Sequence, residues 1–273
     1  MSGYAMGRTA GERERLDMQD RVFSPHSTNL FRQAGVGPGD HVLDVGCGTG
    51  ATTRLLAELV GPAGSVLGID NDPASLEVAE EHTRASGLSN VGYRAGDLTE
   101  LVPGESFDAV AGRLVLLHLS DPAAALARLA RCVRPGGLIV FQEISCSRVR
   151  AVPQIPAMLD WVGWMSMLSA YAGLDADIGE HLPAMFTRAG LADVNAVAVA
   201  VAVIGDSKSL VPRYLAQTLS SVGPLAVASG AATRQQIREF RERLLEEAAD
   251  HGCVLYTQEL TSVWARVEGD PRG

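Results

Sequence analysis

The most informative part of this chain of 273 residues is the stretch VLDVGCGTGA, residues 42–51. Its first four residues are apolar except for Asp44, a composition typical of a buried strand. Three glycines follow at alternate positions: Gly46, Gly48 and Gly50. Glycine permits the backbone conformations of a tight turn and lets a ligand approach the main chain closely. Because leucines at helical spacing come next, in residues 52–60, the stretch predicts a strand, a ligand-binding loop and a helix.

Strand and helix patterns alternate around this loop. Short apolar runs predict buried strands at residues 41–45, 66–69, 91–95, 107–112 and 138–143. Helical patterns that end at glycine or proline separate most of these strands, at residues 52–60, 73–86 and 122–133. Alternation of this kind requires parallel β-α-β units. The sequence therefore predicts an α/β fold with a Rossmann-like, doubly wound sheet of about seven strands.

The two ends of the chain have different patterns. Valines alternate with alanines in residues 193–204, which is the period of a strand, and residues 255–267 predict a last strand. Residues 12–21 predict a short exposed helix outside the core, and residues 22–34 predict a second helix. Further helices are expected in the second half of the chain, at residues 178–189, 210–228 and 234–250.

The composition argues against several kinds of partner. Asp and Glu number 32 against 23 Lys and Arg, a formal net charge of −9, so the chain would repel a nucleic-acid backbone. Hydrophobic residues make up 47% of the chain, which excludes a disordered protein. The longest apolar run, residues 196–204, is too short to span a bilayer. We therefore expect neither a nucleic acid nor a membrane as partner.

The cysteines indicate neither a disulfide framework nor a metal site. Cys47, Cys132, Cys146 and Cys253 are scattered, without a C-x-x-C pair or a Cys/His cluster at zinc spacing. Reduced thiols of this kind are typical of the cytosol. Residues 1–15 are too polar for a secretory signal. We therefore expect a cytoplasmic protein without a metal ion.

Three aspartates help to distinguish between two ligands for the glycine loop, a dinucleotide and a cationic ligand. The loop also satisfies the dinucleotide pattern G-x-G-x-x-A. Asp44, two residues before its first glycine, would repel a pyrophosphate and attract a cation. Asp70 and Asp97 end the second and third strands, where carboxylates can accept from ribose hydroxyls or an adenine amine. Each aspartate alone is also common as a helix cap or turn residue, but all three are expected at the same edge of the sheet.

Five segments together resemble the successive motifs of class I S-adenosylmethionine-dependent methyltransferases. The similarity is greatest to the ubiquinone- and menaquinone-biosynthesis-like enzymes that act on small molecules in secondary metabolism. The segments are residues 42–50, 68–71, 95–98, 107–119 and 134–143. The resemblance covers residues 40–143 and extends to the last two strands, which would form the antiparallel terminal hairpin of that fold. It implies S-adenosyl-L-methionine as the cofactor and says little about the methyl acceptor.

The resemblance implies a role for each residue around the loop. The three loop glycines, with Cys47 among them, would line the methionine and ribose of the cofactor. Asp44 would lie near its ammonium group, and Arg113 would meet its carboxylate.

Residues that follow the next two strands would bind the adenosine end of the cofactor. Asp70 would bind the ribose hydroxyls, and Asn71 would lie against the adenine. Asp97 would accept from the adenine amine, while the backbone of Leu98 would contact the ring.

The resemblance also implies one methyltransferase domain preceded by a lid. Tyr4 and Arg8 in the lid would close over the cofactor. The parts are the lid, residues 1–24, and the domain, residues 25–268, with its cofactor-binding core, residues 36–143, and two acceptor-side insertions, residues 145–177 and 206–252.

The first insertion is rich in methionine and tryptophan. Its stripe consists of Met158, Trp161, Trp164 and Met165. Such side chains can form an adaptable hydrophobic wall for an apolar acceptor. The same stripe is also consistent with an ordinary core or with a contact in a homo-oligomer.

Methyl transfer from a sulfonium depends mainly on positioning, because the donor is already activated. A general base is needed only where the acceptor must lose a proton. His118, after the fourth strand, and Glu143, at the end of the fifth, are the candidates. The alternatives are a structural histidine at a helix start and a structural or substrate-orienting carboxylate.

These features predict an S-adenosylmethionine-dependent methyltransferase for a small apolar acceptor, with antibiotic biosynthesis as one setting. Whether O, N or C is methylated stays open, and C-methylation of a prenyl or terpenoid alkene, with cyclisation, is one variant. Two other functions are possible interpretations: a non-catalytic cofactor-binding protein and an NAD-dependent oxidoreductase. Asp44 and Asp97 argue against the oxidoreductase.

Overall fold

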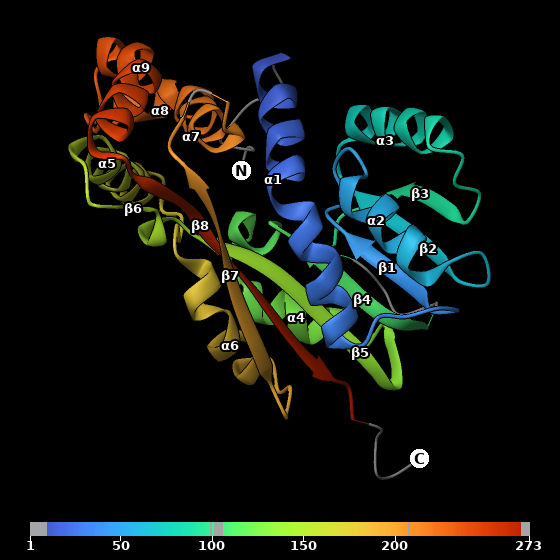
Figure 1. The fold of residues 1–273 in the computed structure, drawn as a ribbon. Coiled ribbons are helices and arrows are strands. Elements are labelled where there is room, and N and C mark those ends of the chain that lie inside the picture. Colours follow the sequence, from blue (N-terminus) through green and yellow to red (C-terminus); the bar gives the residue numbers. More distant parts are fainter. Residues whose placement is uncertain (1–9, 99, 101–105, 207, 269–273) are drawn as a thin grey trace. The chain divides into compact units, whose positions relative to one another are not determined.

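The structure, a computed structural model, describes residues 10–98, 100, 106–206 and 208–268 (Figure 1). Among these residues, eight strands form one sheet in the order β3-β2-β1-β4-β5-β8-β6, and β7 also pairs with β8. The strands are β1 (His41–Val45), β2 (Ser65–Asp70), β3 (Val91–Ala95), β4 (Phe107–Arg113), β5 (Val133–Ser145), β6 (Arg150–Val152), β7 (Asn195–Ile204) and β8 (Val254–Arg266).

Helices connect the strands in the alternating manner that the sequence predicts. The α-helices are α1 (Ala10–Ala34), α2 (Ala51–Val60), α3 (Pro73–Ala85), α4 (Pro122–Ala130), α5 (Pro156–Ala172), α6 (Ile178–Arg188), α7 (Leu210–Ser221), α8 (Gly223–Ala228) and α9 (Arg234–His251). Two short 3₁₀ helices, η1 (Leu116–His118) and η2 (Cys146–Arg148), follow β4 and β5.

The first five strands are parallel, and the last strand runs against them. Strand β1 pairs in parallel with β2 and β4, and β3 and β5 extend the sheet on either side. At the start of β5, Gly136 N donates to Val267 O over 2.8 Å and Val267 N donates to Gly137 O over 2.9 Å, a pairing of antiparallel strands. The arrows of β7 and β8 also point in opposite directions (Figure 1). The predicted α/β sheet with an antiparallel last strand is therefore confirmed.

The chain divides into two compact units. The sheet unit comprises residues 24–143, 179–197 and 261–268, and the helical unit comprises residues 10–23, 144–178 and 198–260. Every described residue predicted for cofactor binding belongs to the sheet unit, and the predicted acceptor wall on α5 belongs to the helical unit.

The core of the sheet unit lies where α2 packs on β1 and its neighbours. Leu55 and Leu56 of α2 are buried with Val42 of β1 and Val140 of β5, and Phe31 of α1 belongs to the same cluster. Strand β1 is buried from its second residue onward, as expected for a strand with neighbours on both sides and helices on its faces. This packing holds the loop between β1 and α2 on a rigid base.

The helical unit is built around the aromatic residues of α5, α7 and α9. The indole N–H of Trp161 donates to Leu215 O over 3.1 Å. The ring of Trp164 packs edge-to-face on that of Phe240, with centroids 5.8 Å apart. Apolar contact between these helices thus replaces the sheet as the organising feature of this unit.

Three features of the fold differ from the sequence prediction. Residues 210–228, predicted as one helix, form two helices, α7 and α8. The first 25 described residues form one continuous helix, α1, instead of an exposed helix followed by a second one. Met18 and Val22 are buried, so the stripe that they form continues through the predicted break. Strand β6 was not predicted, because three residues are too few to show a strand period.

Gly112 is a position where the sheet requires glycine for steric reasons. A Cβ there would lie 2.8 Å from Cδ1 of Phe141, closer still to Cε1, and 3.0 Å from Cγ1 of Val115. We expect Gly112→Ala to lower the free energy of unfolding by about 1–3 kcal/mol through overpacking, measured by chemical denaturation. Gly37→Ala is the control, because a Cβ at Gly37 meets nothing within 4 Å. Equal stability of the two variants would contradict the steric argument.

Candidate active site

The carboxyl ends of the first strands bring the predicted residues to one edge of the sheet. Val45 of β1 pairs with Ile69 of β2, and Asp70 of β2 pairs with Ala95 of β3. The N–H of Gly96 also donates to Asp70 O over 3.0 Å. The loops that follow β1, β2 and β3 therefore start side by side, as the rule for open parallel sheets requires.

Hydrogen bonds to β2 hold the glycine loop in place. The N–H groups of Gly46 and Cys47 donate to Ile69 O over 2.8 and 3.0 Å, and the N–H of Gly48 donates to Oδ2 of Asp70 over 2.8 Å. The φ angles of the loop glycines are +66°, +52° and +77°, in the left-handed region that favours glycine. A Cβ at Gly48 would meet nothing within 4 Å, so the backbone of the loop is open to a ligand at this glycine.

Asp44 is a buried carboxylate on β1, two residues before the first glycine of this loop. Its side chain is 1% exposed, and its Oδ2 accepts from the Thr53 hydroxyl over 2.6 Å. Its Oδ1 is buried without a hydrogen-bond partner among the described residues. Burial raises the pKa of Asp44 to about 7, against the opposing effects of the Thr53 hydrogen bond and the Arg113 charge. A cation at Oδ1 would satisfy this oxygen and restore its ionised form.

Arg113, at the end of β4, supplies the opposite charge. Its Nη1 donates to the hydroxyls of Ser24 and Ser27 on α1, over 3.1 and 3.3 Å. Its charge is close enough to favour the ionised form of Asp44. The site therefore holds a carboxylate and a guanidinium near one another, as a zwitterionic amino-acid group requires.

The carboxylate of Asp70 is oriented by two backbone N–H groups. Gly48 N donates to one oxygen, and Asp72 N donates to the other over 2.9 Å. Asn71 and Asp97 are exposed at the same edge, while Leu98 is buried. This arrangement leaves the polar side chains accessible to a ligand over an apolar base.

Tyr93 is a residue of this region that the sequence analysis missed. It comes from β3, and its hydroxyl forms a hydrogen bond of 2.8 Å with Thr83 on α3. A Cβ at Gly68 would lie 2.7 Å from its ring, and one at Gly50 would overlap its hydroxyl. The signal was present in the sequence, because a glycine inside a strand often marks the close approach of another group.

Glu143 lies fully buried at the end of β5 and caps η1. Its Oε1 accepts from the N–H groups of Val115 and Leu116 over 2.9 and 2.7 Å, while its Oε2 has no partner among the described residues. Burial raises the pKa of Glu143 to about 8, although both hydrogen bonds act to lower it. His118, the last residue of η1, is partly buried. The two predicted base candidates are thus linked through η1.

Other predicted residues lie in different surroundings or outside the described part of the chain. Tyr4 and Arg8 lie outside the described residues. The four residues of the predicted acceptor wall are all buried in the helical unit, where Trp161 and Trp164 make the contacts described above. Their role toward an acceptor stays a prediction, and they also build the core of that unit. Burial raises the pKa of the Cys47 thiol, which favours the neutral form within the loop.

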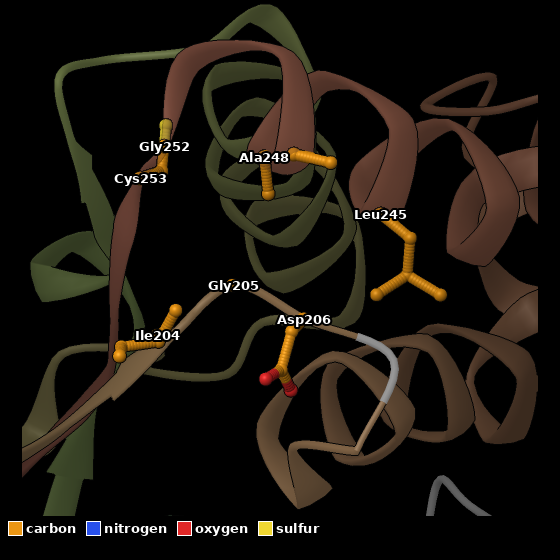
Figure 2. A pocket seen from close by; sticks show the side chains of 8 residues that line it. Ile204, Gly205, Asp206, Leu245, Ala248, Gly252 and Cys253 are labelled. Carbon is orange, nitrogen blue, oxygen red and sulfur yellow. The ribbon is translucent and has the colours of Figure 1, made fainter.

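A pocket of about 420 Å³ lies in the helical unit, between the end of β7, helix α9 and the start of β8 (Figure 2). Its lining is mainly apolar, with Asp206 as a charged member. None of the residues predicted for cofactor or acceptor lines it, so the pocket is a feature separate from the candidate site.

The described residues contain neither a cluster that could bind a metal ion nor a helix that could span a membrane. No three His, Cys, Asp or Glu side chains there could hold a metal ion together. Within the same residues, every helix is too short or too polar to cross a bilayer.

A family model described as a methyltransferase domain matches residues 37–190, more than half of the chain. The chain belongs to the S-adenosylmethionine-dependent methyltransferases. The predicted family and its cofactor, S-adenosyl-L-methionine, are confirmed by this match. The matched region begins just before β1 and contains all the described cofactor residues discussed above.

Individual relatives of this methyltransferase match it over shorter segments. Aklanonic acid methyltransferase DauC of a Streptomyces species is 36% identical over 138 residues, which cover 50% of this chain and 62% of that protein. Demethylmenaquinone methyltransferase of Geobacillus stearothermophilus is 38% identical over 118 residues, which cover 43% and 50%. The chain spans about half the length of the curated relatives that it matches.

A solved structure shares the fold over a longer span. The YcgJ protein of Bacillus subtilis superposes with a TM-score of 0.56 at 18% identity and covers 90% of this chain and 99% of that one. At this identity the likeness concerns the fold alone.

The residues of this methyltransferase fit the cofactor of its family. The unpartnered Oδ1 of Asp44 suits an ammonium group. The open space at Gly48 allows the ligand to reach the backbone, and Asp70 is already oriented by Gly48 and Asp72.

Glu143 makes the stability of the methyltransferase depend on pH. Its folded pKa of about 8 lies above its ordinary value of 4.5, so the neutral form is favoured by folding. This contribution is complete below about pH 4.5 and is lost as the pH rises through 8. Glu143→Gln, which stays neutral, should therefore lose less stability than the wild type between pH 5 and pH 8, measured by denaturation at each pH.

Two further variants complete this test. Glu143→Ala removes the acceptor of two backbone N–H groups and should cost about 1–3 kcal/mol at pH 5. Its difference from the wild type should become smaller toward pH 8, because it also lacks the titrating carboxyl. Glu81→Gln on the exposed surface of α3 is the control and should follow the wild-type pH profile. A Glu143→Gln profile parallel to the wild type would contradict the raised pKa.

Proposed function

We propose that this protein transfers the methyl group of S-adenosyl-L-methionine to a small, largely apolar metabolite. The observation that carries the proposal is Asp44, a buried carboxylate with one unpartnered oxygen just before a glycine loop. Such a group is unfavourable in the free protein and becomes favourable only with a cation beside it. The ammonium group at the methionine end of the cofactor is that cation.

The residues of the chain act mainly by positioning. When bound, S-adenosyl-L-methionine supplies a methyl group already activated on a sulfonium. Asp44 and Arg113 would hold the ammonium and the carboxylate of the methionine end, and Asp70 would accept from the ribose hydroxyls. Asn71, Asp97 and the Leu98 backbone would hold the adenine. The chain would then have to align the acceptor in line with the methyl group and exclude water, and S-adenosylhomocysteine would be the product released.

Where the acceptor must lose a proton, a residue of η1 takes it in this proposal. Glu143 is a positioning residue in this proposal, because its Oε1 is already engaged by the N–H groups of Val115 and Leu116. It holds η1 and thereby His118, which takes the proton where the acceptor must lose one. An alkene acceptor requires no base for its first step, so C-methylation of a prenyl or terpenoid acceptor, with cyclisation, is compatible with the same site.

The names of two relatives support a small acceptor, and the one named for aklanonic acid supports a place in secondary metabolism. One relative is named for aklanonic acid and another for demethylmenaquinone. We extend to this chain only the shared feature, a small metabolite as acceptor.

We also propose that the protein is cytoplasmic and forms a homo-oligomer. For the homo-oligomer, the support is the exposed apolar stripe of Leu159, Met167 and Tyr171 on α5.

Binding and transfer measurements test the proposal against its rivals. Isothermal titration should show binding of S-adenosyl-L-methionine and none of NADH, because a pyrophosphate would be repelled by Asp44. Methyl-labelled cofactor should then transfer label to reduced demethylmenaquinone, aklanonic acid or a prenylated indole. Preference for NADH would favour an oxidoreductase. Cofactor binding without transfer to any acceptor would favour a non-catalytic binding protein.

Asp44 should make cofactor binding depend on pH. Because its pKa is about 7 in the free protein and a cation binds the ionised form, affinity for S-adenosylhomocysteine should fall by about tenfold from pH 8 to pH 6. Asp44→Asn should bind weakly and without this dependence, measured by calorimetry at each pH. Asp40→Asn, just before β1, is the control and should keep the wild-type profile. A pH-dependent affinity that survives in Asp44→Asn would exclude Asp44 as the titrating group.

Asp70→Ala tests the adenosine end of the site. The substitution removes the acceptor for Gly48 N and for the ribose hydroxyls, so cofactor affinity should weaken by about 1–3 kcal/mol. Calorimetry with S-adenosylhomocysteine measures this loss. Unchanged affinity would contradict the role given to Asp70.

A further inference from the structure

Two buried polar side chains in the sheet unit have no role in the site described so far. Gln142 of β5 is fully buried, and neither its Oε1 nor its Nε2 has a hydrogen-bond partner among the described residues. Ser262 of β8 is also fully buried, and its Oγ lacks a partner within the same part of the chain. A buried amide or hydroxyl without a hydrogen-bond partner lowers the free energy of unfolding by about 1–3 kcal/mol. Two such groups together therefore point to a ligand that hydrogen-bonds to them.

The sheet places these two side chains next to one another. Strands β5 and β8 are neighbours. Gly136 N donates to Val267 O and Val267 N donates to Gly137 O, so both glycines face Val267 in a β-bulge, and we count the antiparallel pairing from Gly137 and Val267 onward. Counted along both strands from that pair, Gln142 lies opposite Ser262. The same count sets Val140 opposite Trp264, and Trp264 does pack against the core cluster that contains Val140. Since side chains two residues apart share a face, Gln142 and Ser262 lie on the face that carries this core.

Arg113 lies next to Gln142, on the neighbouring strand that carries a predicted cofactor residue. In the parallel register of β4 and β5, Arg113 pairs with Gln142. Arg113, Gln142 and Ser262 therefore form a polar row across three neighbouring strands, at the carboxyl ends of β4 and β5. Ser24 and Ser27 of α1, which accept from Arg113, lie at the same end of the row. In the proposed function Arg113 meets the methionine end of the cofactor, so the row leads from the cofactor residues to Gln142 and Ser262.

The chemistry of the pair selects a neutral oxygen. An amide offers two N–H donors and a carbonyl acceptor, and a hydroxyl can donate and accept. Neither carries a charge, so the pair offers no compensation for the desolvation of an ionised ligand group. A phenol, an enol or a ketone would satisfy both side chains, whereas a purely hydrocarbon acceptor would leave them unpaired.

We propose that Gln142 and Ser262 form a subsite that hydrogen-bonds a neutral hydroxyl or carbonyl oxygen of the methyl acceptor. The subsite rests on the proposed function, since it lies beside the cofactor residues and names the acceptor class. Its residues determine specificity: they favour oxygenated aromatic or enolic acceptors over hydrocarbons of the same shape. Neither residue touches the methyl donor, so both should be dispensable for cofactor binding.

The test compares two probes of nearly equal shape, 2-naphthol and 2-methylnaphthalene. Each is titrated into the full chain saturated with S-adenosylhomocysteine. The wild type should bind 2-naphthol about tenfold more tightly, the ratio that one or two hydrogen bonds supply. Gln142→Met, which keeps the volume and removes the amide, should reduce this ratio to near one by weakening 2-naphthol alone. Ser262→Ala should reduce it in part.

The matched control is Thr261→Val. Thr261 is the neighbour of Ser262 on the same strand, is buried, and lies on the opposite face. Removing its hydroxyl should leave the ratio of the two affinities at the wild-type value. A loss of preference in all three variants would indicate a general loss of packing and would overturn the subsite.

A second measurement reports on Gln142 directly. The side-chain N–H₂ signals of Gln142, identified by their absence in Gln142→Met, should shift on addition of 2-naphthol and not of 2-methylnaphthalene. Signals that respond to neither probe, or an unchanged ratio in Gln142→Met, would mean that the pair holds buried water only. Absence of 2-naphthol binding to the loaded wild type would also contradict the subsite. Failure of the wild type to bind S-adenosylhomocysteine would instead overturn the proposed function itself.

Discussion

The cofactor site depends on the attachment of the glycine loop to β2. Asp70 receives the N–H of Gly48 on one carboxylate oxygen and that of Asp72 on the other, and Ile69 O receives the N–H groups of Gly46 and Cys47. These bonds hold three consecutive features in register: the end of β1, the turn with its left-handed glycines and the start of α2. The same bonds orient the carboxylate that is expected to meet the ribose, so loop geometry and ligand recognition share one set of contacts.

Two buried carboxylates lie near this attachment and serve different purposes. Each has a raised pKa because burial disfavours its charge. Glu143 is held by two backbone N–H groups and supports η1 within the free protein. Asp44 has one hydroxyl partner and an unpartnered oxygen, and in the proposed function a cationic ligand lies at that oxygen. Glu143 also has an unpartnered oxygen, so the two carboxylates differ in the partners of their other oxygen: two backbone N–H groups at Glu143 and one hydroxyl at Asp44.

The polar side chains discussed above are charged on β1 and β4 and neutral on β5 and β8. Asp44 and Arg113 form an ionic end suited to an amino-acid group, and Gln142 and Ser262 form a neutral end on the strands beyond. A methyltransferase has to hold a charged donor and an acceptor that keeps its nucleophilic atom free of tight ion pairing. The order of strands β1, β4, β5 and β8 provides both environments on adjacent positions of one sheet.

The sequence by itself determined the alternation of strands and helices, the glycine loop and the aspartates that follow β1, β2 and β3. It could do so because periods of two and 3.6 residues report the burial of each element, and because parallel strands end at one edge. Only the tertiary structure showed that Glu143 caps a helix 27 residues earlier in the chain, that the Tyr93 side chain lies next to Gly50 and Gly68, and that Gln142 and Ser262 belong to neighbouring strands. Such pairs depend on the register between strands, which the packing of the whole sheet sets and no local pattern records.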